Sequence, residues 1–262
     1  MGVVNVTPDS FSDGGRFLEP KAAIAHARTL IEEGADMLDV GAESSRPGAQ
    51  GVSAEEELAR LMPVLEGLRD CPVPVSVDTV KPRVMRAALA AGASMINDIR
   101  ALRAEGAMEA VATSGAAVCL MHMRGEPRTM QRKPEYRDVV AEVAAFLEER
   151  VAAAVAAGIA RDRIAVDPGF GFGKTVENNF ELLRKLDRIA AIGCPVVAGW
   201  SRKSTLGAIT GRTADGRLAA SLAAALLAVQ RGARIVRVHD VAATRDALAV
   251  LAAFDGNSQP HE

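Results

Sequence analysis

Eight short runs rich in β-forming residues alternate with longer runs of helical periodicity along almost the whole chain. The β-rich runs are residues 2–7, 37–43, 73–79, 94–99, 117–122, 164–167, 195–201 and 235–240. Parallel strands need a long crossover connection, usually a helix, so this alternation predicts a parallel sheet with helices outside it. Eight such units within about 250 residues are typical of a (β/α)8 TIM barrel. We therefore expect one α/β barrel over residues 1–254, with a doubly wound open sheet as the alternative fold.

The helical runs carry boundary signals that support this division. They are residues 21–33, 54–69, 83–91, 107–113, 139–157, 180–190, 218–230 and 244–253. Gly34, Gly92, Gly158 and Gly232 each follow such a run, where a residue in the left-handed conformation commonly ends a helix. No break in composition divides the chain into two domains. Residues 255–262 are polar, and we expect them to form a disordered tail.

Polar residues collect where the predicted strands end. These residues are Asn5, Thr7, Glu43, Asp78, Asn97, Asp98, His122, Asp167, Ser201, Arg237, His239 and Asp240. In an α/β barrel the active site lies at the carboxyl ends of the strands, because the loops that follow the strands converge there. Apolar or turn residues would serve stability better at these positions. The pattern therefore predicts a functional site at this end of the barrel.

The side chains near these strand ends are of two chemical kinds. Groups that bind phosphate oxygens are Ser45, Arg46, Lys203, Arg237 and His239. Groups that pair with the N–H and C=O edge of a flat heterocycle are Asp78, Asn97 and Asp167. A ligand that combines a polar ring with an anion fits both sets. The sequence has no cluster of His and Cys residues that would indicate a transition-metal site. Oxygen donors together with a phosphate ligand favour Mg²⁺ instead.

The charge balance argues against a polyanionic partner. The chain has 31 basic and 33 acidic residues, a net charge of −2, and only 3% aromatic residues. Neither a basic surface nor a series of stacking side chains is indicated, so we expect no nucleic-acid partner. No apolar run reaches the roughly 18 residues of a membrane span, and no charged-then-apolar leader opens the chain. We expect no membrane partner and a cytoplasmic location.

A glycine-rich segment at residues 169–175 (GFGFGKT) has a superficial likeness to a P-loop. The P-loop motif places four residues between its two glycines, whereas three separate Gly169 from Gly173. The glycines are more consistent with a sharp turn after Asp167 that lets a loop approach a ligand closely. His122 is a lone histidine at the end of a strand, and we expect it to be a satisfied structural group.

Longer motifs resemble those of one enzyme family. Residues 5–14 (NVTPDSFSDG) and 39–48 (DVGAESSRPG) resemble the first and second signatures of the dihydropteroate synthases. Further matches, in the order of that family, are residues 76–79, 97–99, 121–123, 167–174, 201–204 and 237–240. Ser45 stands where the family usually has threonine, and Ala42 stands where glycine is common. The resemblance spans residues 1–240 and implies the TIM barrel of pterin-binding enzymes.

The resemblance implies that (7,8-dihydropterin-6-yl)methyl diphosphate and 4-aminobenzoate are converted to 7,8-dihydropteroate and pyrophosphate, in folate biosynthesis. By the same resemblance, the pterin ring is held by Asp78, Asn97, Asp167, Lys203 and Arg237. The pyrophosphate is bound by Ser45, Arg237 and His239, and Mg²⁺ is bound by Asn5. The aminobenzoate is surrounded by Thr7, Phe11, Arg46, Pro47, Phe172, Lys203 and Ser204. An aniline nitrogen is scarcely protonated at neutral pH, so we expect no single residue to act as a general base.

The resemblance further implies a homodimer formed through the late helices. No insertion interrupts residues 170–174, which favours competition between sulfonamides and 4-aminobenzoate. Two other functions remain possible at this stage. A methyltransferase barrel that binds methyltetrahydrofolate would share the pterin-binding carboxylates, but it should lack the Asn5 loop and the Arg237/His239 pair. A non-catalytic paralogue would bind pterin without carrying out the reaction.

Overall fold

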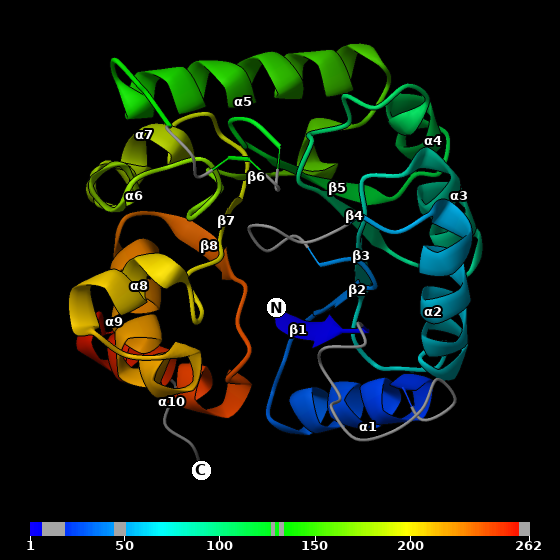
Figure 1. The fold of residues 1–262 in the computed structure, drawn as a ribbon, viewed down its shortest axis with the longest axis horizontal. Coiled ribbons are helices and arrows are strands. Elements are labelled where there is room, and N and C mark those ends of the chain that lie inside the picture. Colours follow the sequence, from blue (N-terminus) through cyan, green and yellow to red (C-terminus); the bar gives the residue numbers. More distant parts are fainter. Residues whose placement is uncertain (7–18, 45–50, 127–128, 131–133, 257–262) are drawn as a thin grey trace.

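The computed structural model describes residues 1–6, 19–44, 51–126, 129–130 and 134–256. In these residues eight parallel strands follow one another in chain order around the sheet. A parallel bridge between Gly2 and Val238 joins the first strand to the segment after the last, so the sheet closes into a barrel (Figure 1). The predicted (β/α)8 barrel is confirmed. The strands are β1 Gly2–Asn5, β2 Leu38–Gly41, β3 Val75–Asp78, β4 Met95–Asp98, β5 Ala117–Met121, β6 Ile164–Asp167, β7 Val196–Ala198 and β8 Ala233–Val236.

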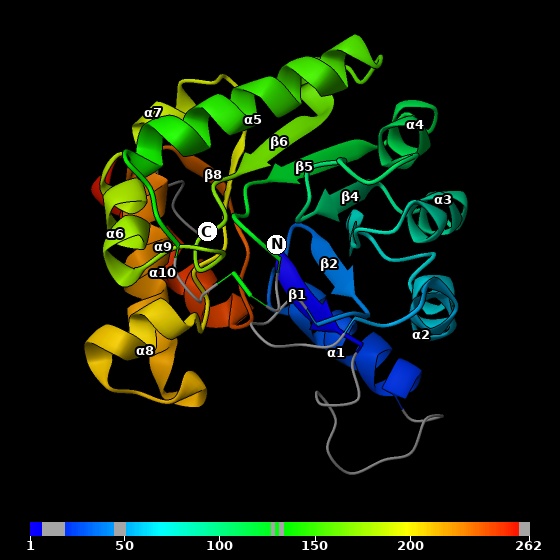
Figure 2. The same cartoon turned by 45° about the horizontal axis from the view of Figure 1, so that its top comes forward.

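Helices surround the barrel and cover the outer face of its sheet (Figures 1 and 2). They are α1 Glu19–Glu32, α2 Ala54–Gly67, α3 Pro82–Ala90, α4 Ala107–Ala112, α5 Val139–Ala156, α6 Val176–Arg184, α7 Leu186–Ala190, α8 Ser204–Thr210, α9 Leu218–Gln230 and α10 Val241–Phe254. Short 3-10 turns occupy Arg161–Arg163 and Ala214–Arg217. None of the described helices combines the length and the apolar character needed to cross a bilayer.

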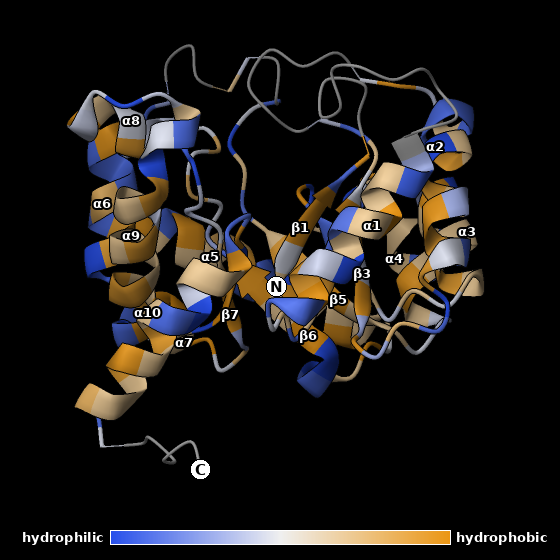
Figure 3. Cartoon of the chain, turned by 90° about the horizontal axis from the view of Figure 1, so that it is seen from below, coloured by the Kyte–Doolittle hydropathy of each residue, from blue (hydrophilic) through white to orange (hydrophobic). Residues whose placement is uncertain are grey.

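Alternation of side chains along the strands places apolar residues on both faces of the sheet. One core lies between the sheet and the helices and includes Ile96 and Val166. A second, separate buried cluster is formed by Met1, Met95, Cys119, Ala165 and Val197. Successive side chains of a strand point to opposite faces, so the second cluster fills the interior of the barrel. The strands are accordingly among the most hydrophobic parts of the chain (Figure 3). A filled interior leaves the strand ends as the place for a ligand.

The register of the strands brings their polar ends to one level. Asn5 of β1 pairs with Gly41 of β2, and Gly41 pairs with Asp78 of β3. Asp78 in turn pairs with Asn97 of β4. Asp167 ends β6 and pairs with the last residue of β5. Residues from distant parts of the sequence therefore meet at the carboxyl end of the barrel, as the sequence pattern predicts.

Several element boundaries differ from those predicted, and one helix was missed; β7, for example, is Val196–Ala198, whereas the pattern predicts a strand over 195–201. β8 begins at Ala233 and ends at Val236, whereas the pattern predicts a strand over 235–240. The earlier start was missed because the exposed Arg234 interrupts the apolar pattern at that point. The single helix predicted over 180–190 is α6 followed by α7, and α6 begins earlier, after a capping box formed by Thr175 and Asn178. α8 was not predicted, since it has only seven residues and contains Gly207. The polar end of the chain, predicted to be disordered, lies outside the described residues from position 257 onward.

Candidate active site

Arg237 lies at the centre of the candidate site. Its Nε donates to Oδ2 of Asp39 at 2.6 Å, and its Nη2 donates to Oδ2 of Asp78 at 3.2 Å. The three side chains come from or directly follow β8, β2 and β3. Burial opposes the positive charge, but Asp39 and Asp78 together raise the pKa of Arg237 above its ordinary value. The guanidinium therefore remains charged and is held in a fixed position at the mouth of the barrel.

Asp39 belongs to the site, although none of the predicted ligand contacts includes it. Its side chain is 0% exposed, and its Oδ2 also accepts a hydrogen bond from Nδ2 of Asn97 at 3.1 Å. Asp39 thus links the predicted residues Asn97 and Arg237. A signal was present in the sequence: a carboxylate inside an otherwise apolar strand must be paired, because an isolated buried charge is strongly unfavourable.

Three buried polar atoms beside this network have no hydrogen-bond partner among the described residues. They are Oδ1 of Asp39, Oγ of Ser76 and Oδ1 of Asn97. They come from the neighbouring strands β2, β3 and β4. Buried polar groups are nearly always paired in folded proteins. Their grouping here is suited to a ligand that carries several N–H or O–H donors.

Asp78 and Asp167 provide two further carboxyl groups in a setting of low polarity. Burial raises the pKa of Asp78 to about 7, although the charge of Arg237 opposes the shift. Burial also raises the pKa of Asp167, against the hydrogen bond that its Oδ1 accepts from the backbone N–H of Gly169 at 2.6 Å. A carboxylate in such a place interacts strongly with the paired N–H groups of a heterocycle.

Lys203 and Phe172 bring the loops after β7 and β6 together. The Nζ atom of Lys203 lies 4.2 Å from the centroid of the Phe172 ring, which is a cation–π contact. Burial, and then repulsion from Arg237, lower the pKa of Lys203 to about 8. A Cβ atom at Gly171 would lie 3.3 Å from Cδ of Lys203, so the two loops are in close contact. The charges of Arg237 and Asp167 are both close enough to shift the pKa of Lys203, in opposite directions.

His239 is joined to Ser201 at the same end of the barrel. The distance between Oγ of Ser201 and Nδ1 of His239 is 2.9 Å, and the backbone N–H of His239 donates to the same hydroxyl. Between them along the chain, Arg202 has a positive φ of 58° and forms two hydrogen bonds with Asp240, at 3.1 and 2.6 Å. This bidentate pair stabilises the turn that carries Ser201 and Lys203.

The predicted site residues fall into three groups. The structure brings together Asp78, Asn97, Asp167, Lys203, Arg237 and Phe172 around the mouth. Asn5 ends β1 at the level of Gly41, His239 is paired with Ser201, and Ser204 is an exposed first residue of α8. The remaining predicted residues lie outside the described part of the chain; they are Thr7, Phe11, Ser45, Arg46 and Pro47.

Asp98, one of the polar strand ends, has a structural role. Its carboxylate is fully buried and accepts hydrogen bonds from the backbone N–H groups of Arg100 at 2.7 Å and Leu102 at 2.8 Å. Burial nevertheless raises the pKa of Asp98 to about 6. Leu102 has a positive φ of 56°, so the carboxylate stabilises a turn in the left-handed conformation. Asp98 stabilises the loop after β4.

The glycine-rich segment after β6 does not present its lysine to a phosphate. The Nζ atom of Lys174 is buried and donates to the backbone carbonyls of Gly169 and Phe172, at 2.9 and 3.1 Å. It also lies 3.0 Å from Nδ1 of His122. His122 is therefore the satisfied structural histidine that was predicted, and the departure from a P-loop is confirmed.

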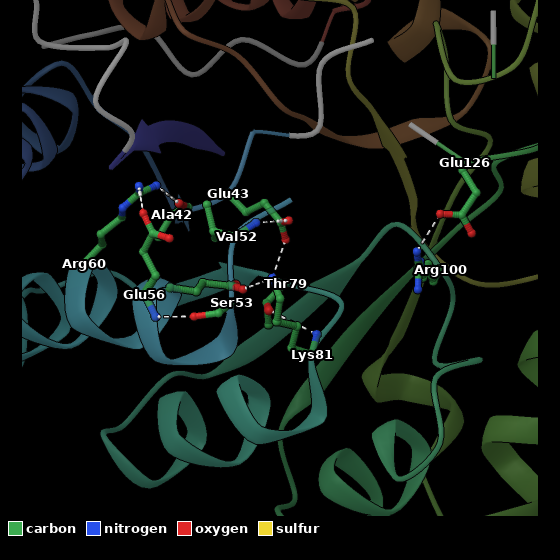
Figure 4. Close-up of polar contacts among 11 residues, drawn as sticks. Ala42, Glu43, Val52, Ser53, Glu56, Arg60, Thr79, Lys81, Arg100 and Glu126 are labelled. Atoms are coloured by element: carbon green, nitrogen blue, oxygen red, sulfur yellow. Dashed lines mark hydrogen bonds and ion pairs between the residues drawn. The ribbon is translucent and has the colours of Figure 1, made fainter. Parts of the chain in front are cut away.

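A second charged network lies at the rim, where β2 and β3 end (Figure 4). The Nζ atom of Lys81 lies 2.6 Å from Oε2 of Glu43 and 2.5 Å from Oε2 of Glu57. Glu57 is 0% exposed. The other oxygen of Glu43 accepts from the backbone N–H of Val52 at 3.1 Å. Lys81 thus joins the end of β2 to α2, and Glu43 joins the end of β2 to the segment that leads into α2.

The oxygen donors at the mouth suit a divalent cation that is shared with a ligand. No group of three or more His, Cys, Asp or Glu side chains in the described residues is arranged to hold a metal by itself. Asn5 supplies a carboxamide oxygen at the end of β1. Mg²⁺ commonly takes only one or two protein oxygens and completes its coordination with phosphate oxygens and water. The residues present fit this mode of binding.

Comparisons with known proteins agree with this geometry. A family model described as "Pterin binding enzyme" matches residues 1–239. A dihydropteroate synthase from Haemophilus influenzae is 49% identical over 253 residues, covering 95% of this chain and 91% of that protein. A Xanthomonas albilineans dihydropteroate synthase solved with 4-aminobenzoic acid has a TM-score of 0.93 at 55% identity, covering 99% of this chain and 93% of the other. A Yersinia pestis dihydropteroate synthase solved with a sulfonamide drug has a TM-score of 0.93 at 44% identity, covering 97% and 93%.

Proposed function

Because the chain belongs to the dihydropteroate synthases of the pterin binding enzyme family, we propose a role for each part of its barrel mouth in that reaction. The enzyme condenses (7,8-dihydropterin-6-yl)methyl diphosphate with 4-aminobenzoate, in folate biosynthesis. The observation that carries the assignment of roles is the position of Arg237 between Asp39 and Asp78, with Lys203 and Asp167 in electrostatic reach. A cation among carboxylates suits a ligand with a polar ring at one end and an anion at the other.

The pterin ring binds to Asp78, Asn97, Asp167, Lys203 and Arg237. A pterin has an edge of alternating N–H donors and ring acceptors, which carboxylate and amide groups match in pairs. The unpartnered Oδ1 atoms of Asp39 and Asn97 support this placement, because they offer acceptors in a place that bulk water does not satisfy. Arg237 is planar and packs along the ring, with its edge held by the two aspartates.

The pyrophosphate binds above the ring, to Arg237, His239 and Ser45. The bond between the pterin methylene carbon and the phosphate oxygen breaks first, and the electron pair leaves with pyrophosphate. Arg237 and His239 stabilise the negative charge that develops on the leaving group. Asn5 holds Mg²⁺, which when bound neutralises charge on the pyrophosphate oxygens. A nearby carboxylate such as Asp167 favours the delocalised cation that remains on the pterin.

The aminobenzoate binds between Phe172, Lys203 and Ser204 on one side and Thr7, Phe11, Arg46 and Pro47 on the other. Its amine nitrogen forms the new bond to the methylene carbon and then loses a proton to solvent. The amine is already unprotonated at neutral pH, so this scheme requires no single general base. Rate enhancement comes from positioning the two substrates and from stabilising the charge of the leaving group.

The same scheme predicts how the enzyme is inhibited. A sulfonamide has the shape and the arylamine of 4-aminobenzoate, so we propose that it competes for the place beside Phe172 and Lys203. The solved Yersinia pestis relative contains a sulfonamide drug. Steady-state inhibition that is competitive with 4-aminobenzoate supports this proposal, and full activity at saturating sulfonamide contradicts it.

We also propose that the enzyme acts in the cytoplasm and forms a homodimer.

Calorimetry tests the assignment of the binding roles. 4-Aminobenzoate is titrated into the protein alone, and then into the protein with pyrophosphate and Mg²⁺. Binding that requires both additions is expected, because the anion and the cation complete the place where the aminobenzoate binds. A protein that binds a pterin analogue but never recruits 4-aminobenzoate under any of these conditions would instead be a non-catalytic pterin-binding paralogue.

A further inference from the structure

Three acceptors surround the buried side-chain ammonium group of Lys174. It is 3% exposed, and its Nζ lies 2.9 Å from the carbonyl oxygen of Gly169, 3.1 Å from that of Phe172 and 3.0 Å from Nδ1 of His122. An ammonium has three N–H donors, and these three acceptors use all of them. The carbonyl oxygen of His122 lies somewhat farther away, at 3.4 Å.

His122 serves as an acceptor in this arrangement. Burial, and then the charge of Lys174, lower the pKa of His122 to about 2, so the imidazole is neutral and Nδ1 can accept. Its ring also contacts Phe146 edge to face, with 5.0 Å between ring centroids. Burial lowers the pKa of Lys174 itself to about 7, and the nearby Asp167 opposes that shift. The lysine therefore depends on these acceptors for its place in the interior.

The loop that surrounds Lys174 lies directly against the end of β5. Gly169 has a φ of +69°, and a Cβ atom there would lie 1.9 Å from the carbonyl oxygen of His122. Gly173 has a φ of +61°, and a Cβ atom there would lie 2.2 Å from the carbonyl oxygen of Arg124. Only glycine fits such an approach. The loop backbone is thus folded around the ammonium group and leaves little space for another arrangement.

This loop carries groups that lie in the candidate active site. The Phe172 ring lies under the Nζ atom of Lys203, and a Cβ atom added at Gly171 would lie 3.3 Å from Cδ of the same lysine. The backbone N–H of Gly169 donates to Asp167. The carbonyl of Phe172 is one of the acceptors of Lys174, so the backbone that bears the ring is fixed by that hydrogen bond.

We propose that Lys174 is a positioning residue, whose ammonium group organises the loop after β6 so that Phe172 forms the wall of the aminobenzoate site beneath Lys203. This role rests on the proposed function for the identity of the second substrate. Lys174 itself contacts no reacting atom, and its effect reaches the substrate through Phe172.

The test removes the ammonium and returns it from solution. In Lys174→Ala we expect the KM for 4-aminobenzoate to rise about tenfold, the effect of roughly one charged hydrogen bond, while the KM for the pterin diphosphate changes much less. Added propylammonium, which matches the missing atoms, is expected to lower the raised KM toward that of the wild type. Lys185→Ala is the matched control, because Lys185 is exposed and pairs with Glu181; neither the change nor the amine should affect it.

A spectroscopic readout separates this inference from the proposed function. Trp200 is the single tryptophan of the chain, and Phe170 of the same loop lies 4.5 Å from it, centroid to centroid. We expect the emission of Trp200 to change in Lys174→Ala and to return with propylammonium. Lys174→Met, which retains the aliphatic volume, should give the same rise in KM and the same change in emission, without rescue by propylammonium because its side chain fills the space; it serves if the alanine variant does not fold. A wild-type protein without synthase activity would refute the function alone, whereas folded variants with unchanged KM values and unchanged emission would overturn the positioning role.

Discussion

Nε of Arg237 lies 2.6 Å from Oδ2 of Asp39, although 198 positions separate the two residues in the sequence. Asp39 is wholly buried and also accepts from Asn97, so it fixes an arginine from the end of the chain against two strands from its beginning. A charged pair with additional hydrogen bonds can be stable in the interior, whereas either partner alone would be strongly unfavourable. The orientation of Arg237 at the mouth of the barrel therefore depends on the fully buried Asp39.

Replacing Asp39 by Asn should reduce catalysis while leaving the shape of the site intact. A hydrogen bond to a charged group contributes about 1.5–3 kcal/mol, so kcat/KM for the pterin diphosphate is expected to fall roughly 10- to 100-fold. Asp98→Asn is the matched control, since Asp98 is equally buried on β4 but caps the backbone of its own loop. That control should lower the melting temperature with little effect on KM; equal kinetic losses in both variants would contradict a specific role for Asp39.

Activity should have a bell-shaped dependence on pH. Burial raises the pKa of Asp78 to about 7, so this carboxyl group is protonated below that pH and cannot accept from the pterin. Burial lowers the pKa of Lys203 to about 8, so its charge is lost above that pH. We expect kcat/KM for the pterin diphosphate to be greatest between about 7 and 8, and Lys203→Arg to remove the decline on the alkaline side, because arginine keeps its charge. A profile that is flat from pH 6 to 9 would contradict these assignments.

The charged network at the rim should contribute strongly to stability. Lys81→Met leaves Glu57 buried without its cation, which is expected to lower the free energy of unfolding by about 3 kcal/mol in urea titrations. Adding Glu57→Gln should recover part of the loss, because the uncompensated charge is then removed. Arg83→Met is the control, since the Arg83–Glu55 pair is exposed on both sides, and little change is expected there. Equal effects of Lys81→Met and Arg83→Met would refute the role of the buried charge.

Exposed apolar side chains on the last helices mark the surface where we expect two copies of the chain to associate. Leu227 of α9 is 48% exposed, and Val250 and Phe254 of α10 are 71% and 81% exposed. The two helices lie side by side on the outside of the barrel (Figure 1). We expect the wild type to sediment as a dimer and Val250→Glu to shift it toward the monomer. Val155→Glu on α5 should leave the dimer unchanged; a monomeric wild type would refute the proposal.

The barrel could be predicted from sequence because its signals are local. Each βα unit shows its own periodicity, and the residues that end the strands, such as Asp78 and Asp167, can be recognised without knowing what they contact. The register of parallel strands then brings these ends to one level. The short α8 and the early start of α6 were missed because seven residues, or a cap with asparagine in place of glutamate, give a weak signal.

The charge pairs of the interior could not be predicted in the same way. Nothing in the neighbourhood of Asp39 in the sequence indicates that its partner is Arg237, because that pairing depends on closure of the barrel. The position of Lys174 likewise follows from the path of the glycine-rich loop against β5, not from the spacing of the glycines. Long-range electrostatic partners of buried groups are a property of the folded chain.

Release of pyrophosphate from (7,8-dihydropterin-6-yl)methyl diphosphate by the purified protein tests the proposed chemistry most directly. With 4-aminobenzoate and Mg²⁺ present, pyrophosphate and 7,8-dihydropteroate should appear in equal amounts. Removing Mg²⁺ with a chelator should abolish both products, and Asn5→Ala should raise the Mg²⁺ concentration that is required. Release of pyrophosphate at the same rate with neither 4-aminobenzoate nor Mg²⁺, or no product at all from folded protein, would contradict the roles assigned to the mouth of the barrel.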